Sequence, residues 1–541
     1  DLETTGLDPR QDRIRLISLA IQTEPGIEIF LIDCFQVDPS PVLEILTEKE
    51  LIIHNGAFDV GFLMQGNWEP KGRFHDTMLM ARLLTAGTDE SVKLADCCQR
   101  YLGISLDKEE QTSDWSADLS KEQIDYAARD AAILIPLHQR LQCEIENANL
   151  TKTLELEERC LPSLVWMSNS GVPFHPQHWR DLAQSANEVV AEIQQQLNEE
   201  APEKPTESSM AETWNWNSPQ QVKEALKLAG CEVANTSMET LSAIDHPLAQ
   251  LLVQYRHALK QSTTFGEDWL KHVAENNRVY PSWWQLGAAS GRMSCSAPNM
   301  QQIPQGQHRE CICAPAGRVL IKADYSQIEL RIAAKISADE ALLHAYLQGE
   351  DLHSRTARNV LGVDKVSKEN RQLAKALNFG LLYGMGTKGF QRYAQSSYGI
   401  SLTAEEAKQY RDNFFQSYPG LARWHRTVRK RKARETRTLA DRRRLLEAKC
   451  YDTKRLNSPV QGTGADGLKL ALALLWERRE EIPGAFPVLA VHDEIVLECE
   501  EDQAERVSEW LKDIMIEAMT PLIAPVPVEV DVQICSPWGG E

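Results

Sequence analysis

The sequence contains no long apolar run. No uninterrupted stretch of nonpolar residues approaches the roughly 20 that a membrane-spanning helix needs, and the chain does not open on a signal peptide. We therefore expect no membrane partner. Basic residues are in the minority, because 58 Lys and Arg stand against 78 Asp and Glu, for a net charge of −20. Binding nucleic acid through uniform positive charge is thereby excluded, and only local patches could serve.

One local patch is plain. Residues 423–444 are crowded with Arg and Lys, including residues 429–432 and 442–444. This patch is either a solvated basic helix and loop or a surface that contacts phosphates. The sequence leaves both interpretations open.

Paired metal-binding cysteines are also lacking. The 12 cysteines are scattered and form no pair of C-x-x-C units, which argues against a zinc site. A reduced, cytoplasmic setting is the simplest account of these thiols. At 541 residues the chain should hold more than one domain, because single cores stop growing near ~250–300 residues. The chain begins at Asp1 rather than Met, so we expect a fragment or a processed product.

A stripe of four side chains marks residues 371–384. Read as a helix, this stretch places Arg371, Lys375, Phe379 and Tyr383 along one face, since each step of four overshoots a turn by only ~40°. Two cations followed by two rings suit a nucleoside triphosphate, with phosphates at one end and a base at the other. The alternative is an amphipathic helix with solvated cations and two core aromatics. Other parts of the chain must decide between them.

The first 150 residues alternate strand-like and helical segments, which predicts an α/β domain. We expect strands at residues 13–21, 27–32 and 51–53, and a helix at residues 122–141. Residues 151–280 are mostly helical in pattern, with one helix at 178–200.

Acidic residues are placed unusually in the first domain. Asp1 and Glu3 share one face of an extended segment, Asp59 follows a strand, and Tyr126 lies one helical turn from Asp130. Converging carboxylates repel unless cations lie between them, and oxygen-only ligation favours magnesium or manganese. A pair of such ions can activate water against a phosphodiester. Each piece alone is more often a solvated rim.

A second acidic pair is expected further along. Residues 319–324 read as a buried strand that ends at Asp324, before a helix that begins near Glu329. Residues 487–498 read as a hairpin with His492 and Asp493 at its tip, where Asp is common because it favours turns. If the hairpin pairs beside the first strand, Asp324 and Asp493 can share two magnesium ions ~3.5–4 Å apart. The loop at 290–304 offers donors that could reach nucleic acid: Arg292, Asn299 and Gln301.

These motifs resemble those of known enzymes. The acidic set with Tyr126 resembles the three motifs of DEDD exonucleases, in the subclass with a tyrosine in the third motif. The remaining runs resemble family A DNA polymerases, of which bacterial DNA polymerase I and the phage replicative enzymes are nearest in kind, and the resemblance covers essentially the whole chain. The runs are S-G-R-M-S-C-S-A-P-N-M-Q-Q-I-P from residue 290, D-Y-S-Q-I-E-L-R from 324, R-x3-K-x3-F-x3-Y-G from 371 and V-H-D-E from 491.

The resemblance implies a fold and a domain order. It implies an α/β, ribonuclease-H-like 3′–5′ exonuclease domain followed by an α+β right-hand polymerase domain of palm, fingers and thumb. In this family the first strand of the exonuclease sheet leads into the residue matched by Asp1, so we expect that strand to lie upstream. The expected domains are the exonuclease at 1–150, a helical thumb region at 151–285, the first palm part at 286–350, the fingers at 351–440 and the second palm part at 441–541.

The resemblance also implies residue roles. The reaction expected is template-directed addition of deoxynucleotides to a primer 3′ end with proofreading, in replication or repair, using two Mg²⁺ ions per active site, or Mn²⁺. The expected partners are primer–template DNA and deoxynucleoside triphosphates, with any processivity factor unknown, in the cytoplasm of a bacterium or of a phage-infected host. The residues that match the family's polymerase metal ligands are Asp324 and Asp493, assisted by Glu494, and those that match its exonuclease metal ligands are Asp1, Glu3, Asp59 and Asp130, with Tyr126 orienting the attacking water. The residues that match its nucleotide contacts are Arg371, Lys375, Phe379, Tyr383, His353 and Glu329, the last as the gate against a 2′-hydroxyl. The residues that match its DNA contacts are Arg292, Asn299, Gln301, Asn457, Gln461 and His492.

One departure and two alternatives remain. Many relatives carry Arg four residues before the residue matched by Asn457, whereas this chain has Thr453 there and Arg455 nearer. A single-subunit RNA polymerase would share the metal ligands but is not expected to carry Glu329 or the exonuclease set. A binding protein without catalysis would have lost a metal carboxylate, and none is missing. Primer extension with deoxy- and ribonucleotides would separate these three.

Overall fold

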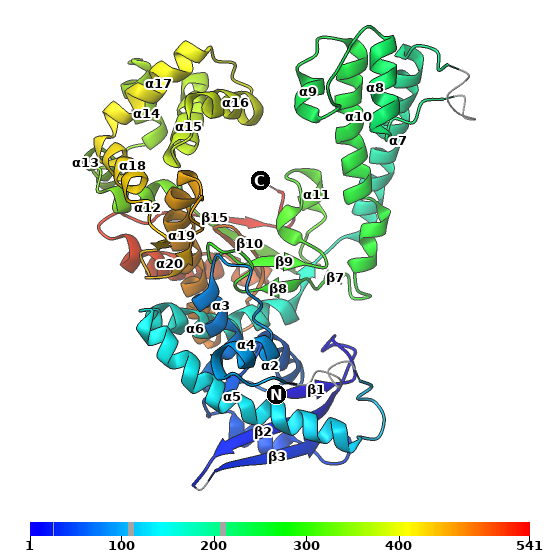
Figure 1. Ribbon diagram of the computed structural model, residues 1–541, viewed down its shortest axis with the longest axis vertical. Helices are drawn as coiled ribbons and strands as arrows, with labels where there is room; N and C mark the ends of the chain where they lie inside the picture. Colours follow the sequence, from blue (N-terminus) through cyan, green and yellow to red (C-terminus); the bar gives the residue numbers. More distant parts are fainter. Residues whose placement is uncertain (25, 107–112, 206–212, 541) are drawn as a thin grey trace. The chain divides into compact units, whose positions relative to one another are not determined.

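The structure is a computed structural model that describes residues 1–24, 26–106, 113–205 and 213–540 (Figure 1). Its contacts divide the chain into two compact units. The larger unit comprises residues 1–171, 281–301 and 316–535, and the smaller one residues 172–280, 302–315 and 536–541. Each is described below by itself.

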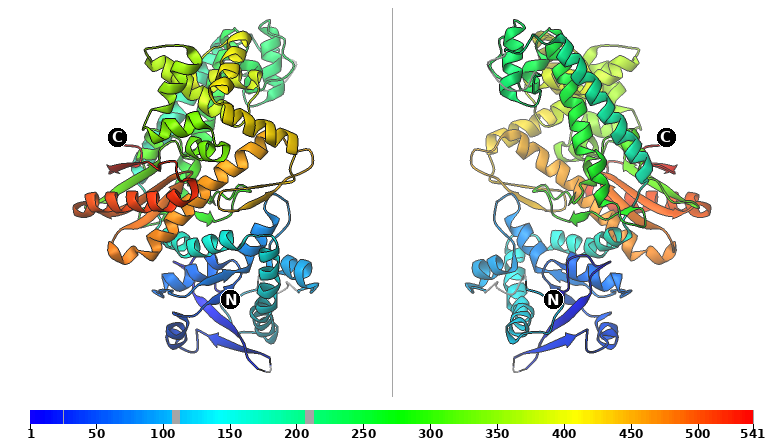
Figure 2. Two further views of the ribbon diagram at one scale, coloured as in Figure 1. Left: turned by 90° about the vertical axis from the view of Figure 1, so that its left-hand side faces the viewer. Right: turned by 90° about the vertical axis from the view of Figure 1, so that its right-hand side faces the viewer.

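The larger unit begins with a small α/β part. An antiparallel sheet of order β1-β2-β3 and a parallel pair β4-β5 enclose apolar residues against the first helices. In Figure 2 the long helix α5 runs beside this sheet, and it packs on β2. The strands are β1 (Leu2–Thr4), β2 (Ile14–Gln22), β3 (Ile27–Asp33), β4 (Leu51–Ile53) and β5 (Phe74–Asp76), and the helices are α1 (Ser40–Leu46), α2 (Gly56–Gln65), α3 (Thr77–Thr85), α4 (Leu94–Leu102) and α5 (Lys121–Asn147). The strands and the helix expected at residues 13–21, 27–32, 51–53 and 122–141 are thereby confirmed.

A four-stranded antiparallel sheet forms the centre of the rest of this unit. Its strand order is β13-β14-β10-β15. Apolar residues of β13 and β14 are buried in continuous runs, and β10 and β14 pack against α20, which lies beside α19 (Figure 1). The strands are β10 (Arg318–Tyr325), β13 (Phe486–Val491), β14 (Glu494–Glu500) and β15 (Val530–Cys535), and the helices are α12 (Ile328–Ser337), α19 (Asp452–Glu477) and α20 (Ala504–Ile523).

Six helices follow α12 as a bundle, which occupies the yellow-green part of the chain in Figure 1. Side-chain caps begin several of them, such as the capping box of Thr403 and Glu406 at α17. The helices are α13 (Glu340–Leu347), α14 (Leu352–Leu361), α15 (Lys368–Leu382), α16 (Thr387–Tyr398), α17 (Ala404–Ser417) and α18 (Pro419–Arg431). The helical stripe predicted at residues 371–383 is α15, except that the helix ends at Leu382 and Tyr383 is its C-cap.

A short hairpin joins these two parts of the larger unit. It consists of β11 (Glu435–Arg437) and β12 (Arg443–Leu445). Its main chain and arginines reach carbonyl groups of the N-terminal α/β part: Leu445 N donates to Ala86 O at 2.7 Å, Arg443 to Leu84 O at 2.9 Å and Arg437 to Ala148 O at 2.9 Å. The C-terminal end of the basic patch therefore contacts protein.

Buried charges lie behind this hairpin. Arg442 donates to Asp466 of α19 at 2.6 Å and to Glu157 of α6 (Thr151–Ser170), and Lys469 donates to Glu157 at 2.6 Å. All four side chains are almost fully buried. Removing one member would leave the others buried without a counter-charge, which is costly.

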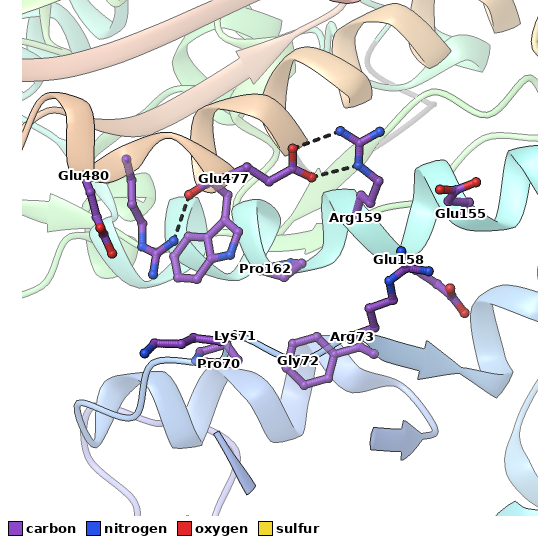
Figure 3. Close-up of a pocket in the computed structure, with 13 residues that line it drawn as sticks. Pro70, Lys71, Gly72, Arg73, Glu155, Glu158, Arg159, Pro162, Glu477 and Glu480 are labelled. Carbon is purple, nitrogen blue, oxygen red and sulfur yellow. Dashed lines mark hydrogen bonds and ion pairs between the residues drawn. The ribbon is translucent and has the colours of Figure 1, made fainter. Parts of the chain in front are cut away.

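The ion pair of Arg159 and Glu477, unlike the buried charges behind the hairpin, is exposed to solvent. Arg159 of α6 donates two hydrogen bonds to Glu477 of α19, at 2.7 and 2.9 Å, at the edge of a cavity of about 580 Å³ (Figure 3). Both partners are more than one-third exposed. Such a pair contributes little to stability.

The smaller unit is mostly helical, as expected for residues 151–280. Trp179 is fully buried in it and stacks on Trp269, with ring centroids 4.4 Å apart. Ser218 caps the helix that follows it, and Pro219 is the first residue of that helix. Its elements are β6 (Val172–Pro173), α7 (Pro176–Glu200), α8 (Pro219–Leu228), α9 (Met238–Ser242), α10 (Pro247–Thr264), β7 (Arg278–Val279) and α11 (Gln307–Glu310).

No helix among the described residues is both long enough and apolar enough to cross a membrane.

Candidate active sites

Two acidic residues meet at the end of the four-stranded sheet. Asp324 lies near the end of β10, and Asp493 lies in the tight turn between β13 and β14, as the sequence predicts. The turn is fixed by a hydrogen bond from Tyr325 N to Asp493 O at 3.2 Å. It also places His492 in a left-handed conformation, with φ of 59°. The strand and the hairpin therefore bring the two carboxyl groups together.

The surroundings of Asp324 and Asp493 oppose the ionisation of both carboxyl groups. Burial, followed by the negative charges of Asp493, Glu494 and Asp531, raises the pKa of Asp324 to about 8. The pKa of Asp493 is raised as well, by burial and by Glu329. One oxygen of Asp324, Oδ1, is buried without a hydrogen-bond partner. A cation between the carboxylates would relieve both the repulsion and the unpaired oxygen.

Glu329 lies in the first turn of α12 and bridges two neighbours. Its Oε1 accepts a hydrogen bond from Arg292 at 2.8 Å, and its Oε2 accepts one from the Tyr383 hydroxyl at 2.5 Å. Burial and the charge of Glu329 raise the pKa of Tyr383, so this tyrosine remains a donor. The three side chains come from a loop, α12 and the end of α15, and they meet beside Asp493.

The cations of α15 differ in their partners. Arg371 forms a two-pronged ion pair with Asp351, at 2.9 and 3.2 Å. This pair holds the pKa of the Asp351 carboxyl well below its usual range, against the effect of burial. Lys375, one turn further on, has no hydrogen bond or ion pair among the described residues. Of the two cations on this face of α15, Arg371 is therefore already paired with Asp351, whereas Lys375 is available to bind a ligand.

His353 lies beneath the same helix. It is buried, its Nδ1 contacts the side-chain nitrogen of Asn378 at 2.8 Å, and its ring lies 5.8 Å from that of Phe379. Burial lowers the pKa of His353 to about 4, so it is neutral at pH 7. Its position supports the ring of Phe379.

The remaining polymerase-type candidates lie on α19 and in the loop after residue 290. Asn457 and Gln461 are one turn apart on α19, and Oδ1 of Asn457 is buried without a partner. Gln301 donates to Ala490 O at 3.1 Å, beside the turn that carries His492. The side chain of Asn299 caps its own loop by accepting from Gln301 N at 3.1 Å.

The departure near Asn457 also has a structural account. Arg455 is buried and donates to Cys450 O at 2.6 Å and to Ala433 O at 3.2 Å. Thr453, where many relatives carry Arg, is exposed. Arg455 therefore stabilises its own loop.

A second acidic group forms in the N-terminal α/β part. Asp59, in the first turn of α2, accepts a hydrogen bond from Leu2 N at 2.8 Å, which ties it to strand β1 between Asp1 and Glu3. Alternation along the strand places Asp1 and Glu3 on one face. Asp130 lies on α5, one helical turn after Tyr126, and its charge raises the pKa of the Tyr126 hydroxyl together with burial.

Three of these acids, Glu3, Asp59 and Asp130, act on one another electrostatically. The pKa of Glu3 is raised to about 8 by burial, then by the charges of Asp130 and Asp59, with the amino group of Asp1 acting in the opposite direction. Burial is also the main cause of the raised pKa values of Asp59 and Asp130. This group, like the first, has more negative charge than its surroundings neutralise.

Comparison with known proteins decides the family. A family model described as DNA polymerase family A matches residues 181–540, and one described as 3'-5' exonuclease matches residues 1–146. The chain belongs to DNA polymerase family A. It is a DNA-directed DNA polymerase with a 3′–5′ exonuclease domain, and it performs template-directed DNA synthesis with proofreading.

Curated relatives and a solved structure agree with this family. The polymerase is 34% identical to DNA polymerase I of Aquifex aeolicus over 99% of this chain and 95% of that protein. It is 30% identical to DNA polymerase I of Pseudomonas aeruginosa over 99% of this chain, and it spans 63% of that longer protein. The fold resembles that of the POL domain of Pol1 from M. smegmatis, whose structure is a complex with DNA primer-template and dNTP, with a TM-score of 0.84, 24% identity and coverage of 99% and 95% of the two chains. The nearness to phage enzymes stays a prediction.

Sequence reasoning missed two residues of the polymerase site. Asp531 of β15 lies directly across from Asp324 in the sheet register, and it adds to the negative charge there. Asp351 holds Arg371, although the sequence analysis considered only its neighbour His353. An acid in an apolar strand, Val530-Asp531-Val532, was the available signal for the first, and an acid at a helix N-cap was the signal for the second.

Proposed function

We propose that Asp324 and Asp493 are the metal-binding carboxylates of nucleotidyl transfer, with Glu494 as an assisting acid. The observation that carries this proposal is the closeness of two half-buried carboxyl groups at the end of one sheet, with raised pKa values and an unpaired buried oxygen. No cluster of three or more His, Cys, Asp or Glu side chains arranged to hold a metal is found among the described residues. Oxygen atoms of substrate, water or main chain would therefore complete the coordination.

The donor set fits a hard divalent cation, because it is made of oxygen alone. Two Mg²⁺ ions, or Mn²⁺, would lower the pKa of the primer 3′-hydroxyl and offset charge on the triphosphate when bound. The protein holds Asp324 and Asp493 in place through the strand register and the turn.

The helix α15 is proposed to bind the incoming deoxynucleoside triphosphate. Lys375, which is available, contacts phosphate and supplies a proton to the leaving pyrophosphate, and Arg371 exchanges Asp351 for phosphate oxygens. Phe379, supported by His353, faces the sugar and base, and Tyr383 lies near the template base. Glu329 excludes a 2′-hydroxyl.

The exonuclease centre is proposed to use the second acidic group. Asp1, Glu3, Asp59 and Asp130 would supply oxygen ligands to two divalent ions, with oxygen atoms of substrate, water or main chain completing the coordination, because the described side chains do not by themselves form a metal-binding cluster. Tyr126, one helical turn before Asp130, orients the water that attacks the terminal phosphodiester. The raised pKa of Glu3 supports this assignment, because a cation would restore its ionised form.

Primer–template DNA is the proposed macromolecular substrate. The proposed DNA contacts are Arg292, Asn299, Gln301, Asn457, Gln461 and His492. We also propose the domain bounds given above, with the exonuclease at 1–150, thumb at 151–285, palm at 286–350 and 441–541, and fingers at 351–440. A cytoplasmic location, in a bacterium or a phage-infected host, is supported by the bacterial relatives.

Two single substitutions test whether the centres are separate. Asp59→Ala should abolish removal of a mismatched 3′ nucleotide while extension continues, and Asp493→Ala should do the reverse. Asp125→Ala and Asp513→Ala remove exposed carboxylates from α5 and α20 and serve as matched controls. Loss of both activities in either test variant, with the circular dichroism spectrum unchanged, would overturn the two-site assignment.

A further inference from the structure

His425 of α18 is buried against the end of α15. The residue is only 3% exposed, and its Nε2 lies 2.9 Å from the carbonyl oxygen of Leu382, the last residue of α15. The last carbonyl groups of a helix have no partner within that helix. His425 therefore supplies, from a different helix, the partner that one of these carbonyl groups needs.

The contact with a carbonyl group fixes the tautomer of His425. A carbonyl oxygen can only accept, so Nε2 carries the proton and donates it. Nδ1 then has no proton, and it is buried without a hydrogen-bond partner. Burial lowers the pKa of His425 to about 4, against the effect of the bond to Leu382, so the ring is neutral at pH 7. The imidazole therefore acts as a neutral donor to the end of α15.

The turn that follows Leu382 packs on the same part of α18. Gly384 has a φ of 76°, and a Cβ atom added there would lie 2.9 Å from Leu456 and 3.6 Å from Nδ1 of His425. Nη2 of Arg429, one turn further along α18, donates to Gly384 O at 3.5 Å. The position of this turn is therefore set by contacts with α18 and α19.

Tyr383 belongs to this turn, and its partner belongs to a helix that also packs on α18. The Tyr383 hydroxyl donates to Oε2 of Glu329 on α12 at 2.5 Å. α12 packs against α18, and the buried carboxylate of Asp339, just after α12, accepts from Gly420 N and Leu421 N of α18 at 2.6 and 3.1 Å. Both ends of the bond between Tyr383 and Glu329 are therefore anchored to α18.

We propose that His425 is a positioning residue for sugar discrimination: by holding Leu382 O, it fixes the end of α15 where the Tyr383 hydroxyl reaches Glu329. His425 acts through Tyr383 and does not itself touch the substrate. Without its hydrogen bond the last turn of α15 shifts, and Glu329 keeps only Arg292 as a firm partner. The proposal rests on the gate against a 2′-hydroxyl proposed above for Glu329.

Two amide variants separate the hydrogen bond from the polarity of the side chain. Glutamine places its amide nitrogen close to the position of Nε2 and can donate to Leu382 O, whereas asparagine is too short to reach it. His425→Asn should raise the ratio of ribonucleotide to deoxynucleotide incorporation efficiency by about 2- to 5-fold, the effect of losing about one hydrogen bond. His425→Gln should leave this ratio close to that of the unsubstituted enzyme.

A third variant and a control protect this comparison from effects of folding. His425→Leu has no donor but suits a buried site, so it should raise the ratio as His425→Asn does, and it replaces that variant if the asparagine is not tolerated. His344→Asn changes an exposed histidine of α13 and should leave the ratio unchanged. Circular dichroism and Tm identify the variants that fold.

A double-mutant cycle tests whether His425 acts through Tyr383. Tyr383→Phe removes the hydroxyl that His425 is proposed to position, so adding His425→Asn to it should raise the ratio no further. If His425 only supported the fold, its effect would instead multiply that of Tyr383→Phe.

Three results would overturn the role of His425 while leaving the gate intact. They are an unchanged ratio in both His425→Asn and His425→Leu, equal ratios in His425→Asn and His425→Gln, and a double variant whose effect is the product of the two single effects. An unchanged ratio in Glu329→Ala would instead overturn the gate, and the role of His425 with it.

Discussion

The hydroxyl of Tyr383 donates to Oε2 of Glu329 at 2.5 Å, and this bond joins the end of α15 to the first turn of α12. Because Arg292 occupies the other oxygen, the Glu329 carboxylate has two fixed partners. If Glu329 is the proposed gate, we expect a carboxylate held in this way not to turn aside for an extra hydroxyl on the sugar. Its orientation is therefore a property of three elements together.

Sugar discrimination is expected to depend on this arrangement. Glu329→Ala should raise the ratio of ribonucleotide to deoxynucleotide incorporation by about tenfold or more, because the 2′-hydroxyl no longer meets a fixed carboxylate. Tyr383→Phe should raise it less, since Arg292 still holds Glu329. Single-nucleotide incorporation efficiencies measure both ratios. Glu340→Ala, an exposed acid at the start of α13, is the control, and an unchanged ratio in Glu329→Ala would rule out the gate.

Discrimination against dideoxynucleotides is expected to depend on Phe379. Its ring has no hydroxyl, so a substrate that lacks the 3′-hydroxyl finds no replacement hydrogen bond near the triphosphate. Phe379→Tyr should supply one and improve dideoxynucleotide use strongly, by about tenfold or more. Incorporation of dideoxy- and deoxynucleotides in competition measures the change. An unaltered ratio would show that α15 does not face the sugar as proposed.

The pH dependence of stability should show how unfavourable it is to ionise Asp324 in the folded protein. Its folded-state pKa is raised to about 8 from an ordinary value of 3.8, so the folded protein binds a proton more tightly than the unfolded chain. Stability from this group is therefore present at low pH and is lost as pH rises from about 4 to about 8. In a chelating buffer, Asp324→Asn should raise Tm at pH 8.5 by roughly 2–5 °C and by less at pH 6.5.

Asparagine has nearly the same shape as aspartate, so this substitution removes the charge with little change in packing. Added Mg²⁺ should stabilise the unsubstituted protein more than the variant, because only the former keeps both carboxylates. Differential scanning calorimetry of both proteins at pH 6.5 and pH 8.5, with and without Mg²⁺, measures these changes in Tm. A lower Tm for Asp324→Asn than for the unsubstituted protein in chelating buffer at pH 8.5 would show that ionised Asp324 does not destabilise the fold.

The buried charges behind the β11–β12 hairpin should matter far more to stability than an exposed pair. Glu157→Ala leaves Lys469 and Arg442 buried with less counter-charge and should cost about 3–5 kcal/mol of unfolding free energy. Glu477→Ala removes the two-pronged partner of Arg159 seen in Figure 3 and should cost at most about 1 kcal/mol. Denaturant unfolding followed by fluorescence compares them. Equal losses of unfolding free energy in Glu157→Ala and Glu477→Ala would show that burial does not determine how much these ion pairs contribute to stability.

Local sequence patterns were enough to predict the elements that carry the sites. The strand before Asp324, the turn at Asp493 and the helix that carries Arg371 are each specified by residues within about ten positions. These predictions are confirmed because alternation, turn chemistry and helical spacing act over short distances.

Partnerships between distant residues could not be predicted in the same way. Arg442 belongs to a run that reads either as a solvated basic patch or as a surface that contacts phosphates, yet it is buried because Glu157 and Asp466 come from helices far away in the chain. The register that places Asp531 opposite Asp324 is likewise set by the packing of β15 on β10. A single sequence contains no signal for such pairings.

The position of Glu157 shows where the chain can be cut. The N-terminal α/β part ends before α6, but the carboxylate that neutralises Lys469 and Arg442 of the same compact unit lies within α6. A polymerase fragment that starts at Thr151 would keep this counter-charge, whereas one that starts at Val172 would bury two cations without it. A stable exonuclease-free fragment should therefore retain α6 and begin near Thr151.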